Sequence, residues 1–143
     1  MSKNNRRKGH NYERDLAKVF RDLGFKHTKT SREASRLYDN AGYDLWGLPF
    51  RVQAKMGYVK NRIKPDVLFK KMNESLEEFP KEEKELLNSY PSVIFNKLDG
   101  YREEHHIVSL QFKDFINLLI ELNVYRGVLT PDEAEQINGK YKK

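Results

Sequence analysis

A short alternating segment, residues 50–56 (FRVQAKM), constrains the fold most, because apolar and polar side chains alternate along it without interruption. Successive side chains of a β-strand point to opposite faces, so this period of two predicts a strand with one face in the core. Residues 43–47 (YDLWG) also have the composition of a strand, and Leu48-Pro49 would form the turn between the two. The segment is therefore expected to fold as a β-hairpin that carries Gln53 and Lys55 on its polar face.

The rest of the pattern predicts helices around a sheet. Apolar side chains recur at helical spacing in residues 12–23, 65–78 and 113–123. Further strands are expected at 25–30, 92–98 and 105–112, a loop at 31–43, and a capping box at Thr130–Glu133 that starts a last helix. The fold class is therefore expected to be α/β, a mixed β-sheet flanked by helices in the order α-β-β-β-α-β-β-α, plus a short C-terminal helix.

The length of 143 residues suits a single domain. We expect a flexible basic arm over residues 1–9, one domain over 10–123, and an extension with a short helix over 124–143. The absence of Cys excludes a disulfide framework and a Cys-ligated zinc site. No apolar run approaches the ~20 residues of a membrane span, and the basic N-terminus lacks the apolar stretch of a secretory signal. A cytoplasmic protein without membrane contact is expected.

Charge is distributed unevenly along the chain. Residues 1–64 contain 16 Lys and Arg against 6 Asp and Glu, whereas residues 65–143 contain 11 against 15. The first half is therefore strongly basic within a chain whose formal net charge is +6. A basic face attracts a polyanion, so nucleic acid is the favoured partner. The alternative is that these cations are scattered over a solvated surface.

Polar side chains with complementary chemistry are expected to meet at the hairpin. If the turn has two residues, Asp44 lies directly opposite Gln53, and Lys55 shares their face about 7 Å farther along the strand. A carboxylate and an amide oxygen are hard ligands that suit Mg²⁺, and Glu13 on the first helix would add a second carboxylate. A neighbouring lysine can orient a water molecule or stabilise charge on phosphorus. The set indicates metal-assisted phosphodiester hydrolysis with Mg²⁺, or with Mn²⁺ as an alternative.

These residues resemble the PD-(D/E)XK nuclease superfamily, in which an Asp, a hairpin and (Glu/Gln)-x-Lys follow a helix that bears a Glu. Residues 8–16 (KGHNYERDL) and the loop residues 30–32 (TSR) are similar to the Holliday junction resolvases of the archaeal and phage type. The resemblance is dense over residues 8–56. Two positions depart from it: Gln53 stands where the family usually has Glu, and Tyr43 where a Pro usually precedes the Asp.

The resemblance implies a restriction-endonuclease-like fold and a homodimer that binds four-way or other branched DNA and nicks two strands symmetrically, in recombination and repair. Glu13, Asp44 and Gln53 would form the metal site, and Lys55 would be the catalytic lysine. Ser31 and Arg32 would touch the DNA backbone, and further contacts are expected from the basic residues Arg6, Arg7, Lys8, Arg14, Arg36, Lys60 and Arg62. The likeness also suggests a nucleoid-associated protein of prokaryotic or viral type.

Two alternatives stay open. One is a restriction or repair endonuclease on the same fold, which would cut linear duplex as well as junctions. The other is a catalytically silent DNA-binding protein, for which Gln53 would be a lost metal ligand. Glu13 by itself is also explained as an acidic residue near a helix start, where the helix dipole favours it.

Overall fold

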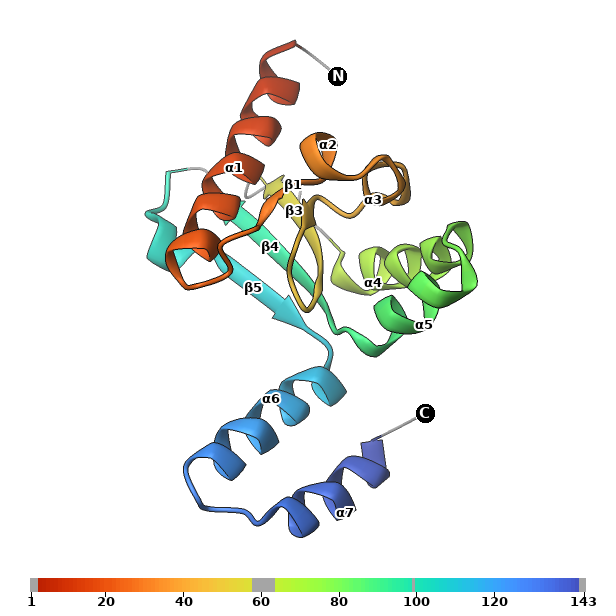
Figure 1. Ribbon diagram of the computed structural model, residues 1–143. Helices are drawn as coiled ribbons and strands as arrows, with labels where there is room; N and C mark the ends of the chain where they lie inside the picture. The colour runs from red at the N-terminus through yellow and green to blue at the C-terminus, as the bar shows by residue number, and fades with distance from the viewer. Residues whose placement is uncertain (1–2, 58–63, 99, 142–143) are drawn as a thin grey trace. The chain divides into compact units, whose positions relative to one another are not determined.

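The computed structural model describes residues 3–57, 64–98 and 100–141 (Figure 1). It divides into two compact units between Ser109 and Leu110. The first unit contains α1 (Lys3–Asp22), β1 (Lys29–Thr30), α2 (Ser31–Ala34), α3 (Arg36–Ala41), β2 (Leu45–Trp46), β3 (Arg51–Gly57), α4 (Pro65–Glu74), η1 (Ser75–Glu78), α5 (Lys81–Ser89), β4 (Ser92–Leu98) and η2 (Glu103–His105). Strand β5 (Ile107–Leu110) spans the division, and α6 (Phe112–Tyr125) and α7 (Pro131–Tyr141) form the second unit.

Helix α1 begins at Lys3, so residues 3–9 are helical and do not form the separate arm expected from their charge. Lys and Arg are good helix formers, and the apolar stripe that follows anchors the helix to the core. The helix ends at Asp22, and Gly24 follows with φ +115°. The Phe25 N–H donates to Phe20 O and the Gly24 N–H to Arg21 O, which is the Schellman pattern of a glycine-terminated helix.

The strands form two small sheets. β1 pairs with β2 antiparallel, whereas β3 pairs with β4 in parallel and β4 also neighbours β5. The expected hairpin is therefore only partly right, because the ladder partner of β2 is β1 and not β3. Gly47 explains the departure: its φ is +89°, and a Cβ there would lie 3.0 Å from His27 O. The chain crosses closely over the segment before β1 at this point and then bends before β3 begins.

Helices cover both faces of the β3–β4 pair, as parallel strands require. On one face Val52, with Ala54 and Met56 beside it, packs against α1, so the predicted alternation is confirmed. On the other face Ile94 packs in a second core with residues of α3, α4, η1 and α5; the buried members of that core are Ala41, Tyr43, Phe69, Met72, Leu76, Phe79, Leu87 and Ile94. The coarse prediction of a small mixed sheet flanked by helices is thus confirmed.

Residues 31–41 form two short helices, α2 and α3, separated by the extended Ser35, where a loop was expected. Ser35 is the N-cap of α3 and its Oγ accepts a hydrogen bond from the Tyr38 N–H, while Gly42 ends the helix at φ +83°. Helices this short present too few apolar positions to show a period of 3.6 residues. The charged segment after Pro80 is likewise helical, as α5, and buries Leu87.

The second unit is a pair of helices. The predicted capping box is confirmed at the start of α7, where the Glu133 N–H donates to Thr130 Oγ1 at 3.2 Å and the Thr130 N–H donates to Glu133 Oε1 at 3.1 Å. Among the described residues, no helix has both the length and the apolar character needed to cross a bilayer.

Arg51 is the largest departure from the expected polar face of β3. It is only 5% exposed, and its guanidinium points into the α4–α5 side of the sheet. Nη1 donates to Met72 O at 3.3 Å, and Nη2 donates to Asn73 Oδ1 at 3.2 Å and to Tyr90 O at 3.3 Å. Arg51 therefore joins β3 to the helices behind it and takes no part in the polar surface of the strand.

Replacing Arg51 by Met should lower the free energy of unfolding by roughly 2–4 kcal/mol, because buried oxygen atoms lose a charged donor that an apolar side chain cannot replace. Urea unfolding followed by circular dichroism measures the change. Lys70→Met, an exposed lysine on α4, is the matched control and should shift stability by less than about 0.5 kcal/mol. Equal midpoints for the two variants would contradict the role given to Arg51.

Candidate active site

The main chain of Asp44 lies where the two sheets meet. Its N–H donates to Val52 O at 2.8 Å, and its carbonyl accepts from the Ser31 N–H at 3.0 Å. The preceding residue, Tyr43, is fully buried and its hydroxyl donates to Met72 O. These contacts fix the position of Asp44 from three directions, so its side chain leaves the backbone at a defined point beside β3.

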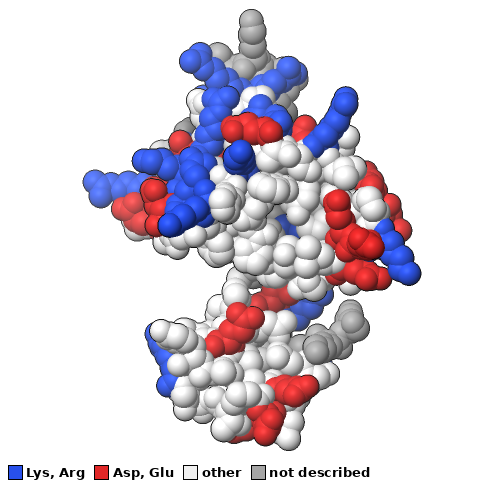
Figure 2. Space-filling model, viewed as in Figure 1, with Lys and Arg blue, Asp and Glu red and all other residues white. Residues whose placement is uncertain are grey.

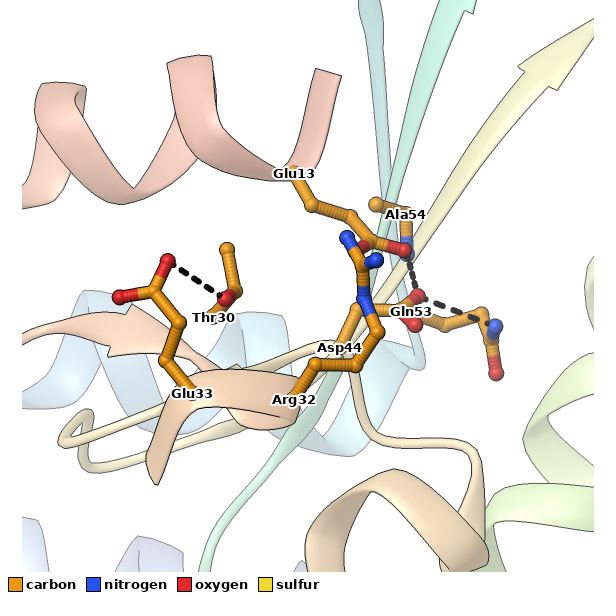
Figure 3. A network of polar contacts seen from close by, with 7 residues as sticks. All are labelled: Glu13, Thr30, Arg32, Glu33, Asp44, Gln53 and Ala54. Carbon is orange, nitrogen blue, oxygen red and sulfur yellow. Dashed lines mark hydrogen bonds and ion pairs between the residues drawn. The ribbon is translucent and has the colours of Figure 1, made fainter. Parts of the chain in front are cut away.

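The carboxylate of Asp44 is held by β3 itself (Figure 3). Its Oδ2 accepts from the Ala54 N–H at 2.7 Å and from Gln53 Nε2 at 3.2 Å. The predicted meeting of Asp44 and Gln53 is confirmed, although the two-residue turn from which it was derived is not. Lys55 is close enough for its positive charge to lower the pKa of the Asp44 carboxyl.

Glu13 reaches the same place from α1. Its side chain is 15% exposed, and its Oε2 lies 3.1 Å from Nη2 of Arg32 on α2. Figure 3 shows the Glu13 carboxylate and the Arg32 guanidinium beside Asp44. The predicted residues Glu13, Asp44 and Gln53 are thus brought together from a helix, a loop and a strand. Arg32, which is expected to contact DNA, is paired with Glu13 in this structure.

The pKa of the Asp44 carboxyl is raised from 3.8 to about 7, chiefly by burial, with a smaller contribution from the charge and a side-chain hydrogen bond of Glu13. The Ala54 N–H and the Lys55 charge act in the opposite direction. The Asp44 carboxyl therefore keeps its proton to a much higher pH than an ordinary aspartate does.

The donor chemistry fits a divalent cation. A metal ion would take the place of the proton on Asp44 and would offset the negative charge of Glu13 beside it. Among the described residues no three His, Cys, Asp or Glu side chains lie close enough to form a metal site by themselves. Gln53 would supply the third oxygen after its amide turns, since its nitrogen now faces Asp44. Magnesium commonly keeps water in its remaining positions.

The other residues expected to bind DNA have different surroundings. Arg6, Arg7, Lys8, Arg14 and Arg36 are exposed, whereas Lys60 and Arg62 lie outside the described residues. Figure 2 shows Lys and Arg gathered over α1, and acidic side chains gathered over the side of α4 and α5. Ser31 is only 2% exposed, and this burial argues against the contact with DNA expected for it. Its main chain positions Asp44 instead.

Sequence reasoning missed two contributors to the site. The Ala54 N–H is a main-chain donor, and a sequence pattern carries no signal for such a group. The ion pair of Arg32 with Glu13 joins residues 19 positions apart, on α2 and α1. A segment interpreted as a loop did not predict that pairing, but recognising Ser31–Ala34 as a helical turn would have set Arg32 on its exposed side.

A scan against protein-family models and searches of curated proteins and of solved structures found no match to this chain. The site is therefore interpreted from its own geometry.

The raised pKa of Asp44 predicts an unusual pH dependence of stability. Between pH 4 and 7 the unfolded chain loses the Asp44 proton while the folded chain keeps it, so stability falls as pH rises through this window. Asp44→Asn should remove this loss and be more stable than the wild type at pH 8, by up to about 4 kcal/mol, with little difference at pH 4. Urea unfolding across pH, in EDTA, measures the difference.

Asp15→Asn, an exposed acid on α1, serves as the control and should follow the wild-type profile. A pH-independent difference between Asp44→Asn and the wild type would show that the Asp44 carboxyl titrates normally.

Proposed function

We propose that this protein is a Mg²⁺-dependent DNA endonuclease, and that its substrate is branched DNA of the four-way type. The observation that carries the proposal is the pair of carboxyl groups at Asp44 and Glu13, one with a pKa of about 7, beside Gln53 and within reach of the charge of Lys55. A half-buried pair of this kind, with a cation next to it, suits the binding of a divalent metal and a phosphate together.

Each side chain has a distinct task in this proposal. Asp44, Glu13 and Gln53 would hold the metal, and the Ala54 N–H keeps the Asp44 carboxylate pointed into the site. Bound Mg²⁺ would neutralise phosphate charge and make a water molecule more acidic. Lys55 would donate a hydrogen bond to the phosphate or to the attacking water and so stabilise the charge that develops on oxygen. Arg32 would move from Glu13 to a phosphate oxygen when substrate arrives.

Charge and resemblance support DNA as the substrate. The cations of α1 are on the same helix as Glu13, and the first 64 residues have a large basic excess. The likeness of residues 8–56 to the resolvases favours junctions over linear duplex, and a homodimer that nicks two strands symmetrically.

Cleavage of a synthetic four-way junction tests the proposal directly. We expect paired symmetric nicks with Mg²⁺ and none with EDTA. Asp44→Asn and Lys55→Ala should each lower the single-turnover rate by roughly 10²–10⁴-fold, because the first removes a metal ligand and the second removes the donor to the phosphate or the attacking water. A matched linear duplex is incubated in parallel.

Two control variants, Asp15→Asn and Lys70→Ala, have the same charge changes at exposed positions and should cut as the wild type does. Equal cutting of junction and duplex would remove the junction claim and keep the nuclease. Tight binding without cutting in Mg²⁺ or Mn²⁺ would identify a silent DNA-binding protein.

One observation favours the second candidate, a DNA-binding protein without nuclease activity. In the structure Glu13 is paired with Arg32, and Asp44 accepts from both Gln53 and Ala54, so both carboxylates already have partners within the chain. A metal must therefore compete with an ion pair and an amide.

Gln53→Glu separates the two candidates. A third carboxylate increases the negative charge of the site and so its affinity for a divalent cation. For a working nuclease, the Mg²⁺ concentration at half-maximal cutting should fall by about tenfold, equivalent to 1.4 kcal/mol of binding free energy. Cutting that appears only in Gln53→Glu would show that the natural chain is silent.

A further inference from the structure

A pocket of about 450 Å³ lies between α1 and the segment that leads into β1 and α2. It is lined by Arg14, Ala17, Arg21, Lys26, Thr28, Lys29, Thr30 and Glu33. Of these residues, only Arg14 was among those expected to bind DNA. The volume lies within the usual range of small-ligand sites, which is roughly 300–1,000 Å³.

The pocket has a buried polar floor and a basic rim. Thr28 and Thr30 are buried, as is Ala17 on the facing side of α1. The four cations are exposed at the rim: Arg14, Arg21, Lys26 and Lys29. Arg14 and Arg21 are seven residues apart on one helix, so their side chains leave it on nearly the same face.

The pocket has a strong excess of positive charge. Within the part of the chain that the structure describes, none of its four cations is in an ion pair. Its one carboxylate, Glu33, accepts a hydrogen bond from Thr30 Oγ1 at 3.1 Å and so is held against the wall. Arg21 Nη1 donates to Thr28 O at 2.9 Å, which holds that guanidinium at the pocket. Such an arrangement attracts a bound anion.

The pocket adjoins the candidate active site through adjacent residues. Arg14 follows Glu13 on α1, and Glu33 follows Arg32 on α2. Figure 3 shows the Thr30–Glu33 pair and the group around Glu13 and Asp44 beneath the same helix. A chain of phosphates lying along α1 would therefore meet both places in turn.

We propose that this pocket binds a backbone phosphate of the DNA strand, next to the phosphate that is cleaved. This inference rests on the proposed function, because it takes the group around Asp44 as the place of cleavage. The lining contains cations and threonines but no aromatic side chain on which a base could stack. The chemistry thus suits the phosphate and sugar of a strand, and it is independent of sequence.

The salt dependence of DNA binding tests the pocket. Lys26→Ala/Lys29→Ala removes two rim cations whose side chains make no hydrogen bond or ion pair within the described residues, whereas Arg21 is left intact because it supports Thr28. The protein is titrated onto a fluorescein-labelled four-way junction and a matched duplex in EDTA, over a series of salt concentrations. The slope of log affinity against log salt should fall in magnitude by about one for both DNAs.

Lys70→Ala/Lys71→Ala, two exposed lysines on α4, is the matched control with the same loss of charge. Its slope should equal that of the wild type. If the two double variants have equal slopes and affinities, the pocket does not bind the DNA backbone. Urea unfolding of both variants checks that the fold is intact.

The result is separate from that of the cleavage assay, because binding in EDTA does not require a working metal site. A changed slope without cutting would support the pocket and reject the nuclease. Cutting with an unchanged slope would support the nuclease and reject the pocket as a DNA contact.

Competition with inorganic phosphate and with deoxyadenosine monophosphate distinguishes the source of the phosphate. If the free nucleotide binds the wild type but not Lys26→Ala/Lys29→Ala, and the slopes are equal, the pocket serves a free nucleotide and the backbone proposal is wrong.

Discussion

Both sheets of the first unit are joined through the main chain of Asp44. Its N–H bonds to Val52 of β3, and its carbonyl accepts from Ser31, which directly follows β1. The side chain of the same residue then turns back to the Ala54 N–H. The hydrogen bonds that unite the sheets are therefore also those that aim the carboxylate. A shift of either sheet would therefore move the candidate site with it. The packing of the two sheets and the geometry of the site both depend on Asp44.

The site combines stabilising and destabilising contacts in a small volume. Desolvating the Asp44 carboxylate next to the negative charge of Glu13 is unfavourable. The Ala54 N–H, Lys55 and Arg32 partly compensate for this cost, because each places positive charge near one of the two carboxylates. Strain of this kind persists where the surrounding fold is stable enough to impose it. The two cores on either side of the β3–β4 pair supply that stability. Arg51, buried behind the strand, adds a polar connection to the second of these cores.

The parts predicted from sequence are those governed by local periodicity. Alternation along residues 50–56 gave the core face of β3 correctly, and Asp44 meets Gln53 because its N–H bond to Val52 keeps the two segments adjacent. The parallel pairing of β3 with β4 joins residues about forty positions apart, which no local pattern encodes. Arg51 alternates in phase with Gln53, yet the face it occupies is covered by α4 and α5. For residues 31–41, the only local signals of a helix were its two capping residues, Ser35 before α3 and Gly42 after it.

The helical state of residues 3–9 has a geometric consequence. A helix rises 1.5 Å per residue, so Arg7, Arg14 and Arg21 recur along α1 at intervals of about 10.5 Å, rotated by only about 20° at each step. That interval is close to the axial rise of three nucleotides in one strand of B-form DNA, about 3.4 Å each. In an unstructured arm, Arg7 would have no fixed distance from Arg14 and Arg21 and could contact a phosphate at any spacing. The helix instead fixes the spacing of these arginines, so a polyanion that binds along it meets positive charges at one regular interval and in one direction.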